Sequence, residues 1–332
     1  METTAYLLVN FGGPRDLDEI EEFLICLLTD QEVIRTPFPA FLHRLLFKRI
    51  AKKRSREIRP DYALIGGRSP IFEDTQAVAS SVSQKLGANV LTFHRYLPKT
   101  HGPFIQSMQR LHQVQRICIV PMFPQFSYAT TGSIALWFSK HLPQEIVAKM
   151  RWVKSYPEQG AYIAAMQQCL SDFMQQQGLG QEETVLLFSA HGLPQSFILT
   201  GDNYEKECRL CFERLKVGFP RAHALLSFQS QFGKQPWIRP YTAEVCAQMG
   251  ELAKGRKNVV VIPLSFTSDH IETLYEIQEL YLPVIRSHGL RAYRCPALNR
   301  REDWISAIAE MFQADQCVLP NTALIRHSLS HR

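Results

Sequence analysis

Two short polar clusters contain the side chains best suited to chemistry in this chain. Residues 189–194 include His191, and residues 268–274 include His270 and Glu272. Imidazole and carboxylate groups bind divalent metals and act as proton acceptors in proteins. The two clusters therefore predict a site for a metal ion or for proton transfer.

Two further carboxylates flank this set. Glu276 follows Glu272 by four positions, so both would lie on one face of the helix that we expect over residues 271–280. Asp269 comes shortly before that helix. An acidic residue at a helix start with Glu three positions later is also typical of a capping box, so Asp269 and Glu272 could simply cap the helix. His191 has a similar alternative, because a histidine that follows a strand is often hydrogen-bonded only within the fold.

Each cluster follows an apolar run that is typical of a buried parallel strand. The runs cover residues 184–188 and 259–264 and contain several β-branched side chains. Ligands of open α/β sheets bind beyond the carboxyl ends of such strands. We therefore expect His191, His270 and Glu272 to meet at one edge of a sheet and to act on one small molecule.

The alternation of strands and amphipathic stretches defines the fold class. Strands are predicted over residues 5–10, 90–95, 116–121, 184–189, 222–228, 258–263 and 291–294. The stretches between them have helical periodicity, and this alternation is typical of an α/β fold with doubly wound parallel sheets.

A weak internal similarity indicates two related halves. Residues 6–10, which lead to Pro14, resemble residues 185–189, which lead to Pro194. We expect two similar Rossmann-like halves with a cleft between them. The predicted bounds are 1–145 for the N-terminal half, 146–315 for the C-terminal half with the metal or proton site, and 316–332 for a C-terminal tail.

The first half is longer than the second because of an insertion near residues 37–60. Within it, the segment from Phe38 to Arg56 has an apolar stripe and a basic end, which is typical of a helix that lies on a membrane surface. The same pattern fits a surface helix that covers the sheet or a pocket and has a solvated basic end. Peripheral membrane contact is therefore one of two interpretations.

Length and composition narrow the class of protein. The 332 residues are 45% hydrophobic, which is enough for two domains with separate cores. The sequence has no apolar run that could span a membrane and enters its first strand without a signal-peptide pattern, so we expect a cytoplasmic protein, peripheral to the inner face of the membrane if the insertion binds lipid. A net charge of +6 suits an acidic small molecule or an anionic membrane as readily as nucleic acid, and we predict no nucleic-acid partner.

Several other chemistries lack their motifs. The chain has no Gly-x-Ser-x-Gly elbow, no phosphate loop ending in Gly-Lys-Ser/Thr and no His-Glu-x-x-His zinc helix. Its eight cysteines, mostly within apolar patterns, are typical of a reducing compartment. Cys208 and Cys211 have the spacing of a metal or redox pair. No second such pair completes a four-cysteine site, so we expect no iron–sulfur cluster at these two residues.

Seven motifs, taken together, resemble the ferrochelatase family. They are residues 10–14, 66–71, 121–127 with 130–133, 189–194, 201–204, 230–233 with 236–237, and 268–274, in order along nearly the whole chain. The resemblance implies the class II chelatase fold and a lyase that inserts Fe²⁺ into protoporphyrin IX, the last step of haem synthesis. It implies ferrous iron and a porphyrin as reaction partners, with no cofactor beyond the substrate iron.

The resemblance also implies roles for individual residues. His191 and Glu272 would hold the iron and take up the pyrrole protons, and His270 and Asp269 would support that pair. Glu276 would extend the acidic row as a path for metal or protons. The porphyrin-binding candidates, from motifs that the family places around its pocket, are Phe11, Arg95, Phe123, Tyr128 and Trp237.

The sequence departs from the family pattern in ways that leave alternatives open. Asn203 stands where the family often has proline, and residues 316–332 lack the cysteine cluster of some relatives. Some bacterial relatives metalate coproporphyrin III, so that substrate remains an alternative. A carrier that binds a tetrapyrrole or a metal without transforming it would share the architecture, but it would not need Glu272 beside two histidines.

Overall fold

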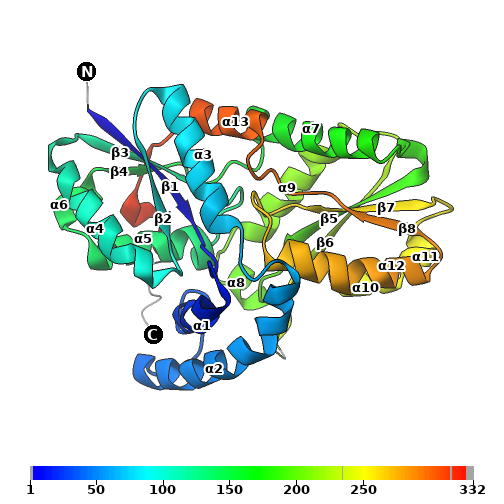
Figure 1. The fold of residues 1–332 in the computed structure, drawn as a ribbon, viewed down its shortest axis with the longest axis horizontal. Helices are drawn as coiled ribbons and strands as arrows, with labels where there is room; N and C mark the ends of the chain where they lie inside the picture. The colour runs from blue at the N-terminus through cyan, green and yellow to red at the C-terminus, as the bar shows by residue number, and fades with distance from the viewer. Residues whose placement is uncertain (1–2, 234, 315, 327–332) are drawn as a thin grey trace. The chain divides into compact units, whose positions relative to one another are not determined.

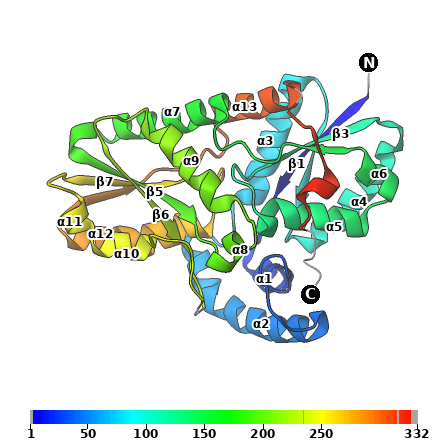
Figure 2. The same ribbon diagram turned by 180° about the vertical axis from the view of Figure 1, so that it is seen from behind.

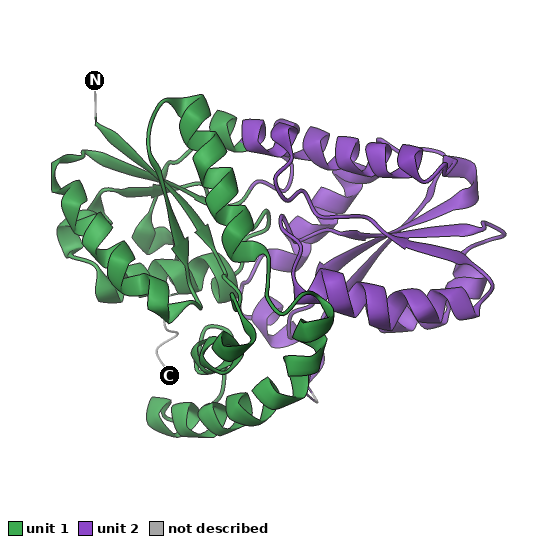
Figure 3. Ribbon diagram, viewed as in Figure 1, with its two compact units in different colours: residues 1–155, 308–332 green, residues 156–307 purple. Residues whose placement is uncertain are grey.

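The structure is a computed structural model that describes residues 3–233, 235–314 and 316–326. The chain forms two compact units, shown in Figure 3: residues 1–155 together with 308–332, and residues 156–307. Each unit is built around its own sheet with helices on both faces (Figures 1 and 2).

The described residues of the first unit form a five-stranded sheet in the order β2-β1-β3-β4-β9. The strands are β1 (Thr4–Asn10), β2 (Val90–His94), β3 (Arg116–Pro121), β4 (Met150–Trp152) and β9 (Leu319–Pro320). The first four run parallel, and β9 runs antiparallel to β4. Leu7, Leu8 and Val9 of β1 are all fully buried, as expected for a strand whose sheet is covered on both faces.

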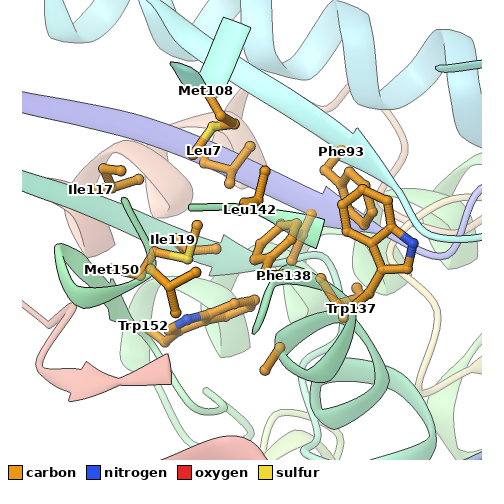
Figure 4. Close-up of a cluster of buried hydrophobic side chains, with 14 of the residues drawn as sticks. Leu7, Phe93, Met108, Ile117, Ile119, Trp137, Phe138, Leu142, Met150 and Trp152 are labelled. Carbon is orange, nitrogen blue, oxygen red and sulfur yellow. The ribbon is translucent and has the colours of Figure 1, made fainter. Parts of the chain in front are cut away.

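Helices on each face of this sheet complete the first core. The helices are α1 (Ile20–Leu28), α2 (Ala40–Leu64), α3 (Ile71–Leu86), α4 (His101–Gln109), α5 (Ser133–His141) and α6 (Gln144–Ala148), with short helices η1 (Leu17–Glu19), η2 (Pro98–Thr100), η3 (Arg110–Gln113), η4 (Tyr128–Gly132) and η7 (Asn321–Leu324). α4, α5 and α6 pack on one face around Phe93, Trp137 and Trp152 (Figure 4). On the other face, Phe312 of α13 (Glu302–Gln313) contacts Tyr6, with 5.1 Å between ring centroids.

The described residues of the second unit form a four-stranded parallel sheet in the order β6-β5-β7-β8. The strands are β5 (Thr184–His191), β6 (His223–Gln229), β7 (Asn258–Pro263) and β8 (Arg291–Arg294). The helices are α7 (Gly160–Gln176), α8 (Gln195–Leu199), α9 (Tyr204–Lys216), α10 (Thr242–Ala247), α11 (Met249–Leu252) and α12 (Leu282–Ser287), with η5 (Gln181–Glu183) and the π-helix η6 (Glu272–Tyr281). α7 and α9 lie on one face, and α10 and α12 lie on the other (Figure 1).

Both units have the same strand order. In each, the second strand along the chain lies at one edge, followed by the first, third and fourth. This order is the flavodoxin-like form of the doubly wound fold, in which ligands bind where the order reverses, between the first and third strands. The predicted fold class of two similar Rossmann-like halves is confirmed, and the reversal in the second unit lies between β5 and β7.

The chain returns to the first unit near its C-terminus. The predicted boundary between the halves follows residue 145 and the predicted tail covers residues 316–332, whereas the first unit extends to residue 155 and resumes at residue 308. β9 pairs with β4, and Asn321 then accepts a hydrogen bond from Trp152 Nε1 at 3.1 Å. Neither β4 nor β9 was predicted, because strands of three and two residues are too short to show a period of two.

The insertion forms α2, which packs against α1 and η1. Its buried positions are His43, Ala51, Ser55 and Tyr62. Exposed apolar side chains lie along the first part of α2 and just before it and are here called the apolar stripe: Phe38, Phe41, Leu42, Leu45, Leu46 and Ile50. Within the residues that the structure describes, no helix is both long and apolar enough to cross a bilayer.

Candidate active site

His191 and Glu272 form a hydrogen-bonded pair at the carboxyl end of β5 in the second sheet. His191 is the last residue of β5, Glu272 is the first of η6, and His191 Nδ1 lies 2.9 Å from Glu272 Oε2. The two residues are 81 positions apart in the chain and meet because β5 and β7 are neighbours in the sheet. Their side chains are 32% and 30% exposed, so both retain surface for a ligand.

The backbone beyond β5 fixes the position of His191. Its amide donates to Ser265 Oγ at 2.9 Å, and the amide of Gly192 donates to the Gln229 carbonyl at 2.8 Å. A Cβ on Gly192 would lie 2.8 Å from the same carbonyl oxygen. Glycine is therefore required for the chain to pass this close to β6.

The paired charges act on each other's pKa. Burial disfavours the charged form of His191, but the Glu272 carboxylate outweighs burial and raises the pKa of His191 above its usual value. Burial also disfavours the ionised form of Glu272, yet the charge and hydrogen bond of His191 lower the pKa of Glu272 to about 2. Because Glu272 is then a pure acceptor, the shared proton sits on His191 Nδ1. Nε2 of the neutral ring is left to bind a metal or accept a proton.

His270 supports the turn that presents Glu272. Its Nδ1 accepts a hydrogen bond from the Glu272 amide at 3.0 Å, and its ring contacts Phe266 with 4.6 Å between centroids. Burial lowers the pKa of His270, which agrees with a ring whose Nδ1 acts as an acceptor. The capping-box alternative is wrong for Glu272, because its carboxylate bonds to His191.

Asp269 is anchored by side chains from three segments. Its Oδ1 accepts hydrogen bonds from Thr273 Oγ1 at 2.7 Å and from Arg294 Nη1 at 2.8 Å. Its Oδ2 accepts from Asn299 Nδ2 at 2.9 Å, and its amide donates to Asn299 Oδ1 at 2.7 Å. These bonds, here called the Asp269 anchor, tie the first turn of η6 to the end of β8 and to the segment that follows it.

Glu276 ties η6 to the end of β6. Its two oxygens accept hydrogen bonds from the Ser230 amide at 2.9 Å, the Ser230 hydroxyl, Gln229 Nε2 at 3.2 Å and the Tyr281 hydroxyl. Gln229 Nε2 also donates to the Glu272 carbonyl at 2.9 Å. Glu276 thus follows Glu272 on the same helix, as predicted, with its carboxylate bonded to neighbouring residues.

Trp237 is the predicted porphyrin-binding residue that lies in the second unit, beside His191. Its ring lies edge-on to His191, with 6.4 Å between centroids, and its Nε1 donates to the Phe232 carbonyl at 3.0 Å. It is only 5% exposed. Phe266 flanks His191 at the same centroid distance of 6.4 Å. The imidazole of His191 therefore has two aromatic rings as neighbours.

The aromatic candidates of the first unit are all partly buried. Phe11 follows β1 and contacts Tyr96, with 4.5 Å between ring centroids. Phe123 follows β3 and packs against the first core. Tyr128 begins η4 and contacts Phe126 at 5.1 Å. Phe11 and Phe123 thus lie just beyond the carboxyl ends of two central strands of their own sheet.

Arg95 follows β2 and is held in an internal network of the first unit. Its Nη2 lies 2.7 Å from Asp30 Oδ2, and its Nε donates to Ser133 Oγ at 2.9 Å. The Arg95 and Asp30 side chains are 13% and 7% exposed. The Tyr96 hydroxyl donates to the same Asp30 oxygen at 3.0 Å. The positive charge of Arg95 is therefore already compensated by a carboxylate.

Cys208 and Cys211 lie inside α9 and are fully buried. Burial raises the pKa of the Cys208 thiol well above its usual value, and Cys211 Sγ lies 4.0 Å from the Tyr162 hydroxyl. Metals bind the thiolate form of cysteine, which this setting disfavours. Over the described residues, no group of three or more His, Cys, Asp or Glu side chains is arranged to hold a metal ion.

Sequence reasoning missed the residues that fix the predicted ones in place. They are Gln229, Ser230, Ser265, Arg294 and Asn299, which hydrogen-bond to the pair, to Glu276 or to Asp269. One signal was available: Gln229 directly follows a predicted strand, Arg294 ends another, and the ends of adjacent parallel strands lie side by side.

The fold belongs to the chelatase class. SirB from Bacillus subtilis with Fe³⁺ superimposes with a TM-score of 0.53 at 12% identity, covering 95% of this chain and 96% of SirB. CbiX, the terminal enzyme for siroheme biosynthesis in denitrifying bacteria, superimposes with a TM-score of 0.51 at 16% identity, covering 94% and 99% of the two chains. At such low identities the likeness defines the fold alone.

Sequence comparison defines the family. The sequence model of the ferrochelatase family matches residues 3–316. The ferrochelatase of Chlamydia pneumoniae is 40% identical over 331 residues, covering 100% of this chain and 99% of the relative, and that of Chlamydia muridarum is 42% identical over 311 residues, covering 94% and 95%. The chain belongs to the ferrochelatase family, and the predicted resemblance is confirmed. It is an enzyme of haem synthesis, a lyase that acts on a porphyrin and ferrous iron.

Proposed function

We propose that this chain inserts Fe²⁺ into protoporphyrin IX and that His191 and Glu272 bind the iron and take up the pyrrole protons. The observation that carries the proposal is the 2.9 Å hydrogen bond between the two side chains at the carboxyl end of β5. A carboxylate and an imidazole bind Fe²⁺ but lack the thiolates that would retain it. Such a pair can deliver the metal to another ligand.

His191 and Glu272 must together account for the protons that the porphyrin releases. Metalation of a porphyrin releases two N–H protons as the nitrogens replace the ligands of the metal. Nε2 of neutral His191 is free to accept one of these protons, because Nδ1 carries the proton bonded to Glu272, and the Glu272 carboxylate takes up the other. The Glu272 carboxylate stabilises the imidazolium that results, as its effect on the pKa of His191 indicates.

His270, Asp269 and Glu276 act as positioning residues in this proposal. His270 and the Asp269 anchor fix the turn before Glu272, and Glu276 holds η6 on Gln229 and Ser230. The carboxylate of Glu276, four positions after Glu272 on the same helix, also extends the acidic row along which metal or protons would move. Residues that hold metal ligands in place commonly matter about 10–100-fold for activity.

The macrocycle requires apolar faces and cations for its propionates. Phe11, Phe123, Tyr128 and Trp237 supply aromatic faces in this proposal. Arg95 would meet a propionate with N–H donors other than those engaged with Asp30 and Ser133, since guanidinium has five.

The choice of porphyrin is tested by an anaerobic assay with Fe²⁺ in which protoporphyrin IX and coproporphyrin III are offered in parallel. We expect faster formation of haem from protoporphyrin IX, followed by absorbance. Faster metalation of coproporphyrin III would retain the roles of His191 and Glu272 but overturn the substrate. Binding of both porphyrins without metalation of either would overturn the proposal in favour of a carrier.

The apolar stripe of α2 supports a second part of the proposal: this protein is cytoplasmic and binds the inner face of the membrane through α2. Phe41 and Leu45 at its centre are 69% and 54% exposed. Exposed basic residues follow on the same helix: Lys48, Arg49, Lys52, Lys53, Arg54 and Arg56. An apolar stripe beside such a basic segment matches an anionic bilayer surface.

Flotation with vesicles that contain phosphatidylglycerol tests this contact. We expect the wild type to float with the vesicles, and the triple charge reversal of Lys52, Lys53 and Arg54 to Glu to remain at the bottom. A control with the same change of charge uses exposed lysines of the second unit, Lys206, Lys254 and Lys257. Equal flotation of the wild type and the α2 variant would contradict the proposed membrane contact.

We further propose that the enzyme uses no resident cofactor and no nucleic-acid partner. The buried thiols of Cys208 and Cys211 support the first point, because their setting disfavours the thiolates that an iron–sulfur cluster requires. Iron analysis of the purified protein after removal of loosely bound metal tests it. Acid-labile sulfide in stoichiometric amount would contradict the proposal.

A further inference from the structure

Cys169 and Cys295 form a pair of adjacent free thiols in the second unit. Cys169 lies on α7, Cys295 directly follows β8, and each thiol shifts the pKa of the other. Cys169 Sγ also lies 3.7 Å from the carbonyl oxygen of Pro296, the neighbour of Cys295. Cys169 and Cys295 are 4% and 1% exposed, so this contact is built into the fold.

Cys169 lines a pocket that a small oxidant can enter. The pocket has a volume of about 330 Å³, and its walls include Phe173 and Asp172 from α7 and Pro296 and Arg301 from the segment after β8. A single water molecule occupies about 30 Å³ in the liquid, so hydrogen peroxide fits easily. Cys169 is therefore the member of the pair that an oxidant in the pocket would meet.

The charges around Cys169 also favour its reaction with an oxidant. The hydrogen bond from Cys295 lowers the pKa of Cys169; burial opposes this effect and the Arg301 guanidinium adds to it, while Asp172 and Asp303 raise the pKa. The same hydrogen bond, with burial, raises the pKa of Cys295. The thiolate is the form of cysteine that reacts with peroxides. Because Cys169 lines the pocket and Cys295 does not, Cys169 is the attacking thiol and Cys295 the resolving one.

The segment that contains Cys295 also carries most of the Asp269 anchor. Arg294, which precedes Cys295, donates to Asp269 Oδ1 at 2.8 Å, and Asn299, four residues later, exchanges two hydrogen bonds with Asp269. A disulfide brings its two sulfurs to about 2.05 Å, closer than any hydrogen-bonded pair of thiols. Closing it would pull residue 295 toward α7 and disturb the contacts of Arg294 and Asn299.

We propose that Cys169 and Cys295 are an oxidation site at which hydrogen peroxide forms a reversible disulfide that slows iron insertion. The Cys169 thiolate attacks the peroxide, an S–O bond forms, the O–O bond breaks, and hydroxide leaves as water after protonation. The Cys295 sulfur then attacks the sulfenic sulfur, the S–S bond forms, and a second water leaves. In total two thiols and one peroxide give one disulfide and two waters. Formation of the disulfide does not depend on which reaction the enzyme catalyses. Its effect on iron insertion rests on the proposed function.

Mass spectrometry of peptides from the folded protein tests the site directly. After one equivalent of peroxide, we expect a cross-linked peptide that joins Cys169 to Cys295, with the mass of both peptides less two hydrogens, which a thiol reductant separates again. Cys118 and Cys317 provide an internal control, because both are also buried thiols, but interaction with Cys118 and burial raise the pKa of Cys317 and neither residue lines the pocket. Oxidation of that second pair before the first would overturn the proposal.

Iron insertion measured in the same samples tests the consequence. We expect the oxidised wild type to be about tenfold slower, as for the loss of a group that positions a metal ligand, with full recovery on reduction. Cys295→Ala should keep its rate after peroxide, and Cys317→Ala should lose it as the wild type does. A cross-link without any change of rate would overturn the coupling. Failure of the reduced wild type to metalate a porphyrin would instead overturn the proposed function, and would leave the cross-link result standing.

Discussion

At the scale of single residues, His191 and Glu272 set each other's protonation. The carboxylate raises the pKa of His191, and the imidazole lowers the pKa of Glu272 to about 2. Below the raised pKa, His191 is an imidazolium whose two N–H groups neither bind Fe²⁺ nor accept a proton. Iron insertion should therefore increase as pH rises through the pKa of His191.

The first prediction concerns that pKa. In the wild type, NMR titration should give His191 a midpoint above the ordinary histidine value of about 6.5. In Glu272→Gln the main raising influence is gone and burial, which lowers the pKa, remains, so the midpoint should move to lower pH. An unchanged His191 midpoint would show that Glu272 does not set its charge.

Sequence alone predicted that His191, His270 and Glu272 lie together, but not the residues that hold them in place. His191, His270 and Glu272 could be predicted because histidines and carboxylates after two apolar runs are rare and chemically specific. Gln229 and Asn299 could not, because amide residues carry no such signal and their roles depend on register and loop geometry. Arg95 illustrates the same limit, since nothing in its local sequence indicates the ion pair with Asp30.

At the scale of elements, the turn after β5 is the most constrained part of the site. Gly192→Ala would place a Cβ 2.8 Å from the Gln229 carbonyl and 3.1 Å from the Trp237 ring. We expect β5 and β6 to separate at this end, with a loss of about 1–3 kcal/mol in the free energy of unfolding and a lower rate of iron insertion. Chemical denaturation and the haem assay measure the two effects.

Gly102→Ala is the matched control for this turn. Gly102 lies in α4 with open space around the position of a Cβ, so alanine should leave stability unchanged or raise it slightly. Equal stability of the Gly192 and Gly102 variants would show that the close approach of the two strands is not needed.

The seven longer strands could be predicted because runs of buried β-branched residues are distinctive. Their bounds agree with the observed strands to within two residues: β5, for example, runs to His191, whereas the prediction ended at residue 189. β4 and β9 escaped prediction because their stability comes from a sheet edge that exists only after the first unit has folded. The π-helical form of η6 gives no sequence signal, although a helix was predicted at that position.

At the scale of the whole molecule, the return of the C-terminal segment completes the first unit. The amide of Asn321, which is 2% exposed, accepts from Trp152 Nε1 at 3.1 Å and donates to the Ala135 carbonyl and to Ser139 Oγ, each at 2.9 Å. These bonds join η7 to β4 and α5. If the C-terminal segment were only a tail after the second half, these hydrogen bonds would not form.

Asn321→Ala should therefore destabilise the protein. The variant leaves the buried Trp152 N–H and Ala135 carbonyl without this partner, so we expect a loss of about 1–3 kcal/mol in the free energy of unfolding, measured by chemical denaturation. Asn203→Ala is the control, because Asn203 is exposed and makes no capping hydrogen bond, and should change stability by less than about 0.5 kcal/mol. If the two variants were equally stable, the C-terminal segment would not be an integral part of the first unit.

The most direct test of the central claim is iron insertion by His191→Ala and Glu272→Gln, measured anaerobically with porphyrin binding followed by tryptophan fluorescence in the same samples. We predict that both variants bind porphyrin as the wild type does and that their rate of haem formation falls by a factor of about 10²–10⁴, the usual contribution of a positioned proton acceptor. His112→Ala, which removes an exposed histidine, should retain the wild-type rate. Turnover near the wild-type rate in both site variants would contradict the assignment of His191 and Glu272.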